Sequence, residues 1–265
     1  MTALPSARIA VIGGSGLYSL FDEGQAQQHT VRTPYGDAVV AVGELGGRDV
    51  AFLARHGAGH TVSPHLINYR ANIWALASLG VTAIVSSAAV GGVSPDCPPG
   101  TLVLTDQYLD RTSGRPDTFY DDGSVQHLPS ADPFCPVLHD AAVRALGDGA
   151  APTGTVVVIQ GPRFSTRAES QWFAAMGAHT VNMTLYPEVP LASELNIGTI
   201  NLSFVTDTDA APAGERLSAE LVFARFAEAQ PRILRALHAL VAAVPEEYSG
   251  RQLIDPAEVA AVLAR

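Results

Sequence analysis

Residues 8–16 read RIAVIGGSG, and this stretch indicates the fold class of the chain. Later segments repeat its pattern of a strand followed by a polar turn. The apolar run Ile9 to Ile12 is typical of a short strand buried on both faces. The strand ends at Gly13-Gly14-Ser15-Gly16, where glycines and a serine favour a tight turn. A buried strand that leads directly into a polar, glycine-rich turn is expected of an α/β sheet whose ligand site lies at its strand ends.

The rest of the chain alternates between predicted strands and predicted helices. Strands are predicted at 37–45, 48–54, 81–86, 102–104, 155–159, 180–183 and 198–206, the first two joined as a hairpin at Gly46-Gly47. Helices are predicted at 65–79, 137–147, 167–176, 188–195 and 218–243, the last kinked or broken at Pro231, with a short final helix starting at Asp255. This order predicts an α/β fold with a central, mostly parallel or mixed sheet.

Polar or glycine-rich turns follow six of these strands, at residues 13–16, 55–60, 87–92, 161–165, 182–184 and 207–209. In open α/β sheets, ligands bind at the carboxyl ends of the strands. The six turns are therefore predicted to surround one site. The polar segment 110–135 is too long for a simple connection, and we interpret it as a functional loop.

Composition narrows the classes of function. The chain has 265 residues with a formal net charge of −10, and its 16 basic residues are all arginine. An acidic chain is a poor candidate for binding nucleic acid or a membrane surface, both of which require a basic face. The absence of lysine excludes a Schiff-base lysine and a P-loop lysine. Any bound anion must be held by arginine, histidine, hydroxyls or backbone N–H groups.

The same composition predicts one large domain in the cytoplasm. No apolar run reaches the length of a transmembrane helix, and Met1–Ser6 does not resemble a secretion signal. Cys97 and Cys135 lie far apart and lack the spacing of a metal site, which favours a reduced compartment.

Three of the turns carry residues with chemical potential, and each leaves an alternative open. Gly13 to Gly16 is not a dinucleotide-binding fingerprint, because position 19 is serine and no clear helix follows. Two interpretations stay open for this turn: an anion-binding nest that includes Ser15, and an ordinary tight turn. Arg55 suits a phosphate, and His56 could add a second donor; the rival interpretations are a metal site of His56 and His60, or a surface arginine beside a packed histidine.

The third turn is Asp207-Thr208-Asp209. A carboxylate at this position could act as a general acid if it is partly buried. Metal binding by the two aspartates and a simple solvated turn are the alternatives.

Taken together, segments between about residues 8 and 243 resemble the trimeric purine nucleoside phosphorylase family, in its methylthioadenosine branch. The matching motifs are Ile12 to Leu17, Arg55-His56-Gly57, Asn68 to Leu76, Asp110-Arg111-Thr112, Arg115-Pro116, Gly161 to Glu169, Asn182-Met183-Thr184, Pro187-Glu188 and Thr206 to Asp209. The resemblance implies a partly barrel-like sheet flanked by helices in a nucleoside phosphorylase domain over 1–245, and a homotrimer. The tail 246–265, with its short helix, has no match and is expected to pack on a neighbouring subunit.

The resemblance also implies a reaction and a set of site residues. Inorganic phosphate, a co-substrate, attacks C1′ of S-methyl-5′-thioadenosine and releases adenine, with no metal and no cofactor. The implied phosphate ligands are Ser15, Arg55, His56, Ala89 through its backbone, and Thr184. The implied nucleoside contacts are Phe164, Ser165, Met183, Asp207 and Asp209, with His127, Ala219, Val222 and Phe223 at the 5′ end. Asp207 and His56 are the implied catalytic residues, Asp207 as the donor to purine N7.

Two departures from the family pattern affect specificity. The methylthioadenosine branch usually has threonines where Ser87 and Ala88 stand, so one phosphate hydroxyl is missing. The pair Ser165 and Asp207 is the pattern for a 6-aminopurine, whereas the 6-oxopurine branch has Glu and Asn at these positions. A carboxyl near N7 can accept from the 6-amino group and donate to N7, and such a polar match typically contributes on the order of 10⁴-fold in discrimination.

Other functions remain open at this stage. The nucleoside could instead be adenosine, a 5′-halo-adenosine, methylthioinosine or a 6-oxopurine nucleoside. A hydrolytic nucleosidase would not need the phosphate ligands. A non-catalytic nucleotide-binding module would want the complete glycine fingerprint, which is broken here.

Overall fold

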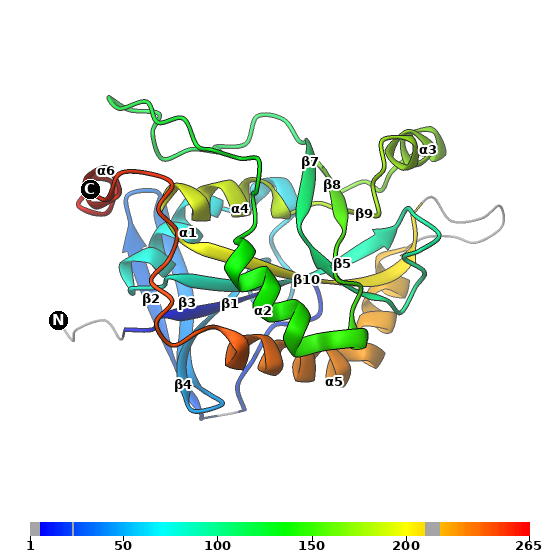
Figure 1. Cartoon of the computed structure of the whole chain (residues 1–265), viewed down its shortest axis with the longest axis horizontal. Coiled ribbons are helices and arrows are strands. Elements are labelled where there is room, and N and C mark those ends of the chain that lie inside the picture. The colour runs from blue at the N-terminus through cyan, green and yellow to red at the C-terminus, as the bar shows by residue number, and fades with distance from the viewer. Residues whose placement is uncertain (1–5, 23, 210–217) are drawn as a thin grey trace.

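The computed structural model describes residues 6–22, 24–209 and 218–265, and in these ranges ten strands form one mixed sheet flanked by six α-helices (Figure 1). The strands are β1 (Ile9–Gly13), β2 (Ala26–Thr33), β3 (Gly36–Leu45), β4 (Arg48–Ala54), β5 (Ala83–Gly92), β6 (Leu102–Thr105), β7 (Gln107–Arg111), β8 (Thr155–Ile159), β9 (Thr180–Asn182) and β10 (Gly198–Thr208). The helices are α1 (Tyr69–Ser78), α2 (Pro136–Leu146), α3 (Arg167–Ala175), α4 (Leu185–Glu194), α5 (Ala219–Ala243) and α6 (Pro256–Leu263). The predicted α/β class with a mixed sheet is confirmed.

The sheet branches at β5. Its main path runs β2-β3-β4-β1-β5-β9-β8-β7, and β10 pairs with both β5 and β6. Strand β5 is parallel to β1 along Ala83–Ser86 and to β10 along its whole length, and it is antiparallel to β9 at Gly91 and Gly92. One strand thus connects three others and brings their ends to a single region.

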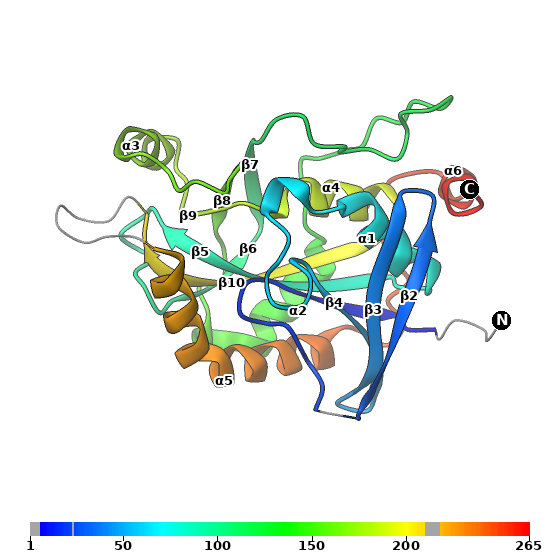
Figure 2. The ribbon, with the colours of Figure 1, turned by 180° about the vertical axis from the view of Figure 1, so that it is seen from behind.

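Both faces of the central strands are buried, and each face has its own core. Ala10 and Ile12 of β1 belong to a cluster with α1, α4 and α6, whereas Ile9 and Val11 belong to a cluster with α2 and α5. The alternation follows from the two-residue period of a strand. Figures 1 and 2 show α1 and α4 on one side of the sheet and α2 and α5 on the other.

Helix α5 corrects part of one prediction. It continues as one 25-residue helix through Pro231, so the helix is not broken there; a kink at Pro231 stays a prediction. Phe226 before the proline and Ile233 and Leu237 after it are all buried in the same core cluster, and this packing outweighs the hydrogen bond that proline removes.

Two polar strands were missed. Strand β2 has one buried residue among eight and pairs only with β3, and β7 is a short strand that pairs only with β8. Edge strands such as these lack the apolar run by which a buried strand is recognised. The segments 87–92 and 207–208 were predicted as turns but continue β5 and β10 as strand.

The C-terminal tail packs against its own chain. Trp74 of α1 donates from Nε1 to the carbonyl of Val262 in α6, and the Asn196 side chain bonds the backbone of Leu253 and Ile254. Asp255 caps α6 by accepting from the N–H of Ala257, as predicted. Contact of the tail with a neighbouring subunit stays a prediction.

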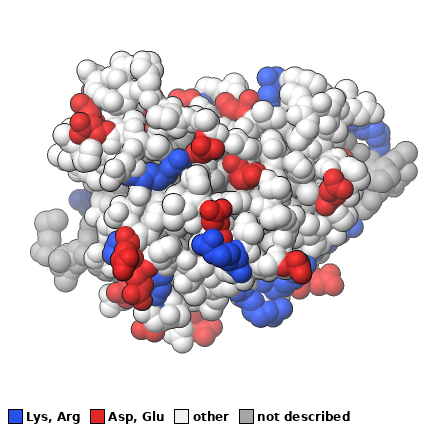
Figure 3. Space-filling model, in the orientation of Figure 1, with Lys and Arg blue, Asp and Glu red and all other residues white. Residues whose placement is uncertain are grey.

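The surface shown in Figure 3 carries acidic and basic side chains interspersed with one another. Among the described helices, none is long and apolar enough to cross a membrane. The prediction about a secretion signal falls on Met1–Ser6, of which residues 1–5 lie outside the described ranges.

Candidate active site

One pocket collects residues from all six of the predicted segments. Its lining includes Ser15, Arg55, His56, Ala89, Phe164, Ser165, Met183, Thr184, Asp207, Asp209, Ala219, Val222 and Phe223, which is every predicted site residue except His127. The ends of β1, β4, β5, β8, β9 and β10 meet here because β9 approaches the end of β5 from the opposite direction, with Gly91 facing Val181.

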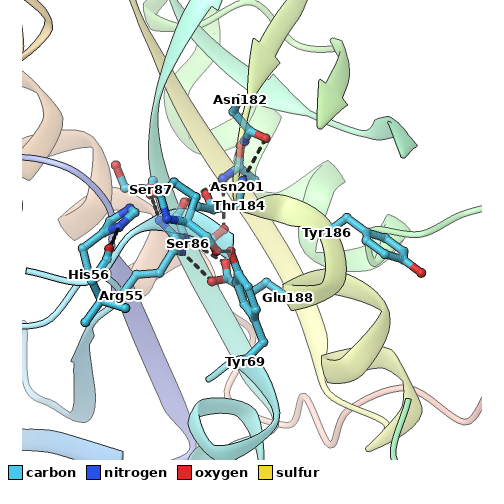
Figure 4. Close-up of polar contacts among 12 residues, drawn as sticks. Arg55, His56, Tyr69, Ser86, Ser87, Asn182, Thr184, Tyr186, Glu188 and Asn201 are labelled. Carbon is cyan, nitrogen blue, oxygen red and sulfur yellow. Dashed lines mark hydrogen bonds and ion pairs between the residues drawn. The ribbon is translucent and has the colours of Figure 1, made fainter. Parts of the chain in front are cut away.

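Arg55 is the cationic residue of the lining. It lies directly after β4, is 2% exposed, and forms a two-point ion pair with Glu188, with Nε–Oε2 at 2.6 Å and Nη2–Oε1 at 2.8 Å (Figure 4). Nη1 donates to the carbonyl of Ser87 at 2.9 Å. Burial acts to lower the pKa of Arg55, but the charge and hydrogen bonds of Glu188 prevail, and the pKa lies above its ordinary value. The guanidinium is therefore charged and held rigidly.

His56 is buried beside Arg55 and is neutral at physiological pH. Burial, reinforced by the positive charge of Arg55 and by His60 and opposed by a hydrogen bond to Val62, lowers its pKa to about 4. The Nδ1 atom lies 2.9 Å from the carbonyl of Val62, and since a carbonyl only accepts, Nδ1 carries the proton. Nε2 of this tautomer has a lone pair and no proton, so it can accept a hydrogen bond. The second donor expected from the sequence is an acceptor in the neutral ring.

Asp207 lies at a bulge near the end of β10 and lines the same pocket. The register between β5 and β10 shifts between Val205 and Asp207, which changes the direction of the side chains at the end of β10. Asp207 is 5% exposed, and its Oδ1 accepts from Thr206 Oγ1 at 2.6 Å. A Cβ at position 91 would lie 3.3 Å from Asp207 Oδ2 and 3.2 Å from Asp209 Cβ, so Gly91 leaves the space that both carboxylates occupy.

Three polar atoms of the pocket residues are shielded from solvent and have no hydrogen-bond partner in the described part of the chain. They are His60 Nδ1, Ser165 Oγ and Asn182 Nδ2. Buried polar groups are normally paired, so these three atoms are suited to contact a polar ligand. Ser165 is a predicted nucleoside contact, whereas Asn182 belongs to one of the matching motifs and has no predicted role at the site.

Helix α5 contributes apolar side chains to the pocket. Ala219, Val222 and Phe223 come from the first turn and a half of α5, and Phe223 makes an edge contact with His60 at 5.0 Å between ring centroids. His60 in turn lies 4.3 Å from the ring of His56. The predicted 5′ residues of α5 thus face the same space as the predicted phosphate ligands.

His127 is the one predicted site residue that the fold does not bring to the pocket of its own chain. It is exposed and lies in the long loop between β7 and α2, outside the pocket lining. The metal alternatives for His56 with His60 and for the aspartates find no support within residues 6–22, 24–209 and 218–265, where no group of three or more His, Cys, Asp or Glu side chains could hold a metal ion.

Glu188 belongs to the motif Pro187-Glu188, but the sequence predicts no role for it at the site. The available signal was a charged residue inside the apolar run Leu185–Leu191, because a carboxylate in a buried helix face requires a partner. Periodicity alone could not identify Arg55 as that partner, because the two residues are 133 positions apart in the sequence.

The pocket combines a buried arginine, a neutral histidine and a threonine hydroxyl with a buried carboxyl and an apolar end, at the strand ends of a mixed α/β sheet. Residues 8–242 match the family model described as the phosphorylase superfamily, and the chain belongs to this family.

Particular relatives are similar over nearly their full length. The chain is 50% identical to S-methyl-5′-thioadenosine phosphorylase of Mycobacterium tuberculosis, covering 90% of each chain. It is 47% identical to a purine nucleoside phosphorylase of Streptomyces coelicolor, again with 90% of each chain covered. A crystal structure of a methylthioadenosine phosphorylase from an antarctic soil metagenomic library superposes with a TM-score of 0.86 at 36% identity, covering 98% of this chain and 99% of the other.

Proposed function

We propose that the protein catalyses the phosphorolysis of S-methyl-5′-thioadenosine, which yields adenine and 5-methylthioribose 1-phosphate. The observation that carries the proposal is the pocket itself, which places Arg55, His56 and Thr184 in one cavity with Ser165, Asp207 and the apolar start of α5. The relatives with the name S-methyl-5′-thioadenosine phosphorylase support the same activity.

In the proposed reaction, phosphate lies among Ser15, Arg55, His56, Thr184 and the backbone at Ala89. Arg55 donates to two phosphate oxygens from N–H groups that Glu188 does not use. Neutral His56 accepts a hydrogen bond at Nε2 from the hydroxyl group of hydrogen phosphate, which keeps its proton. These contacts hold one oxygen of the anion toward C1′ of the nucleoside, and positioning of this kind provides a large part of the rate.

The C1′–N9 bond breaks as the phosphate oxygen forms its bond to C1′. The ribosyl group gains oxocarbenium character, which the phosphate anion stabilises, and the purine gains negative charge. We assign Asp207, protonated in the complex, as the donor to N7, so that the bonding electrons leave on a neutral base. Met183 lies beneath the ribose in this arrangement, and Phe164 covers the purine.

Ser165, Asp207 and Asp209 would select the base. The Asp207 carboxyl can accept from a 6-amino group while it donates to N7, and the shielded Ser165 hydroxyl belongs to the lining of the same pocket. The 6-oxo group of a 6-oxopurine is a hydrogen-bond acceptor and would face the carboxyl oxygen of Asp207 that accepts from a 6-amino group. We therefore assign adenine rather than hypoxanthine or guanine as the leaving base.

We further propose that the protein is a cytoplasmic homotrimer in which His127 completes the pocket of a neighbouring subunit. The exposure of His127 and its position outside its own pocket support an intersubunit role. The apolar residues of α5 would then cover one side of the 5′-methylthio group and His127 the other.

The decisive experiment measures release of adenine from methylthioadenosine with and without inorganic phosphate, followed by a panel that varies only the 5′ substituent and the 6 position of the base. Phosphate-dependent release with methylthioadenosine as the best substrate is the expected result. Release of adenine that does not depend on phosphate would indicate a nucleosidase. A preference for inosine would indicate a member of the 6-oxopurine branch.

A further inference from the structure

The buried carboxylate of Glu188 does not line the pocket, yet it contacts the residue on which phosphate binding depends. The side chains of Arg55 and Glu188 are 1% and 4% exposed, and both carboxylate oxygens are used by the same guanidinium. Figure 4 shows the two groups face to face beside Ser87 and Tyr69. Arg55 is the only arginine among the described lining residues, and the chain contains no lysine that could replace it.

A buried ion pair is a poor device for stability alone. Removing two charges from water is costly, and replacing such a pair by apolar residues is often neutral or stabilising. A two-point contact does, however, fix the plane of a guanidinium, which a single hydrogen bond cannot do. This geometry therefore indicates a requirement for a particular orientation of Arg55.

The hydrogen-bond count specifies that orientation. A guanidinium has five N–H donors. Nε and Nη2 donate to Glu188, and Nη1 donates to the Ser87 carbonyl at 2.9 Å. Two N–H groups remain for a ligand, one on each terminal nitrogen. Without Glu188 the guanidinium could rotate, and its donors would no longer be directed at a fixed point in the pocket.

Glu188 also lies in the element that carries another phosphate residue. Thr184 is the N-cap of α4, and Glu188 follows it by four positions, after a kink at Tyr186 and Pro187 where the backbone is not helical. The threonine hydroxyl and the partner of Arg55 thus come from one short segment.

We propose that Glu188 is a positioning residue of the phosphate site, which acts by holding Arg55 in the orientation that presents two N–H groups to inorganic phosphate. This inference rests on the proposed function, because it assumes that phosphate is the ligand of Arg55. Glu188 itself does not touch the substrate.

The test is the variant Glu188→Gln, which keeps the size of the side chain but can accept only one of the two hydrogen bonds. We expect the dissociation constant and the KM of inorganic phosphate to rise roughly tenfold to a hundredfold, with the KM of the nucleoside unchanged. Calorimetric titration with phosphate provides a readout that does not depend on turnover. A phosphate affinity within twofold of the wild type in a folded Glu188→Gln protein would overturn the proposal.

Glu194→Gln is the matched control for the loss of a buried carboxylate. Glu194 lies in the same helix, is 5% exposed, and accepts from Thr118 Oγ1 and from the N–H of Phe119, each at 2.7 Å. Its partners belong to the long loop and not to the pocket lining. This variant should lower Tm and leave phosphate affinity unchanged; an equal loss of phosphate affinity would show that Glu188 has only a structural role.

A double variant separates positioning from folding. Arg55→Met with Glu188→Leu should be more stable than Arg55→Met alone, because no uncompensated charge stays buried, yet it should bind phosphate as poorly as Arg55→Met. A further loss of affinity in the double variant would show that Glu188 acts independently of Arg55. If wild-type protein binds phosphate but releases no adenine, the proposed reaction fails while the role of Glu188 is still decided by the titrations.

Discussion

Asp207 is the residue at which the proposed chemistry is most open to disproof. Its carboxyl is buried, stands at a bulge, and is oriented by the Thr206 hydroxyl. Asp207→Asn keeps this shape but removes the transferable proton. We expect kcat for methylthioadenosine to fall by roughly 10²–10⁴-fold, which is the usual contribution of a positioned acid.

Steady-state kinetics on the purified Asp207→Asn protein check this expectation. The KM of phosphate serves as the internal control, since Asp207 is assigned to the purine and not to phosphate, and its substitution should leave this KM unchanged. Activity within about threefold of the wild type would refute the assignment, because a general acid contributes far more. Addition of Ser165→Glu should then shift the residual activity toward inosine-type nucleosides.

His56 predicts how stability depends on pH. Its pKa is about 4 in the folded protein, below the ordinary value of 6.5, so between these two values the unfolded chain binds more protons than the native state. Above pH 6.5 the histidine is neutral in both states and does not lower the free energy of unfolding. As the pH falls toward 4, protonation of His56 in the unfolded chain lowers the free energy of unfolding, by about 3 kcal/mol at pH 4.

Urea unfolding of the wild type and of His56→Gln at pH 7 and at pH 4.5 measures this effect. Glutamine cannot be protonated, so the variant should lose less free energy of unfolding between the two pH values than the wild type does. The contribution of the carboxylates to this loss is the same in both proteins and cancels in the difference. Equal losses in both proteins would contradict a neutral, buried His56.

At the scale of the element, the turn Gly13 to Gly16 lies against Arg55 and the Ser87 carbonyl, two groups of the proposed phosphate site. A Cβ on Gly14 would lie 2.5 Å from the Ser87 carbonyl oxygen and 2.9 Å from Arg55 Nη1, closer than real contacts allow. Gly14→Ala should therefore displace the hydrogen bond between Arg55 and Ser87. We expect a phosphate KM raised about tenfold, the loss typical of one displaced charge-assisted hydrogen bond.

Gly149→Ala is the control variant for the kinetics of Gly14→Ala. A Cβ at Gly149 meets no atom within 4 Å, and the residue lies outside the pocket lining. That variant should retain wild-type phosphate kinetics. Should Gly14→Ala behave in the same way, the turn does not support Arg55 and serves only as a connection.

At the scale of the whole molecule, the proposed trimer makes activity a property of the assembly. Mixing Asp207→Asn chains with His127→Ala chains would create some pockets that have Asp207 from one subunit and His127 from another. At methylthioadenosine concentrations below KM, such mixed assemblies should be more active than either parent alone. Sedimentation analysis should give three subunits; a fully active monomer, or no gain on mixing, would exclude a shared pocket.

Much of this architecture follows from local sequence patterns. The apolar runs of β1 and β8 identify strands that are buried on both faces. Strands β5 and β10 are predicted from their apolar residues, although each also buries polar side chains such as Ser86 and Asn201. The cap at Asp255 and the hairpin at Gly46-Gly47 are also local, since each depends on neighbouring residues. The rule that ligands bind at strand ends was sufficient to collect six distant segments into one site.

Only the tertiary structure decided how these residues are used. The pairing of Arg55 with Glu188, the donor on His56 Nδ1 and the bulge before Asp207 depend on atoms far apart in sequence, and no local propensity encodes them. The same applies to β2, an edge strand whose residues have little apolar periodicity, and to α5, which core packing keeps helical through Pro231. The sequence by itself determined most of the elements and which residues gather at their ends; long-range packing decided the polar edge strands and the orientation and hydrogen bonds of the groups in the pocket.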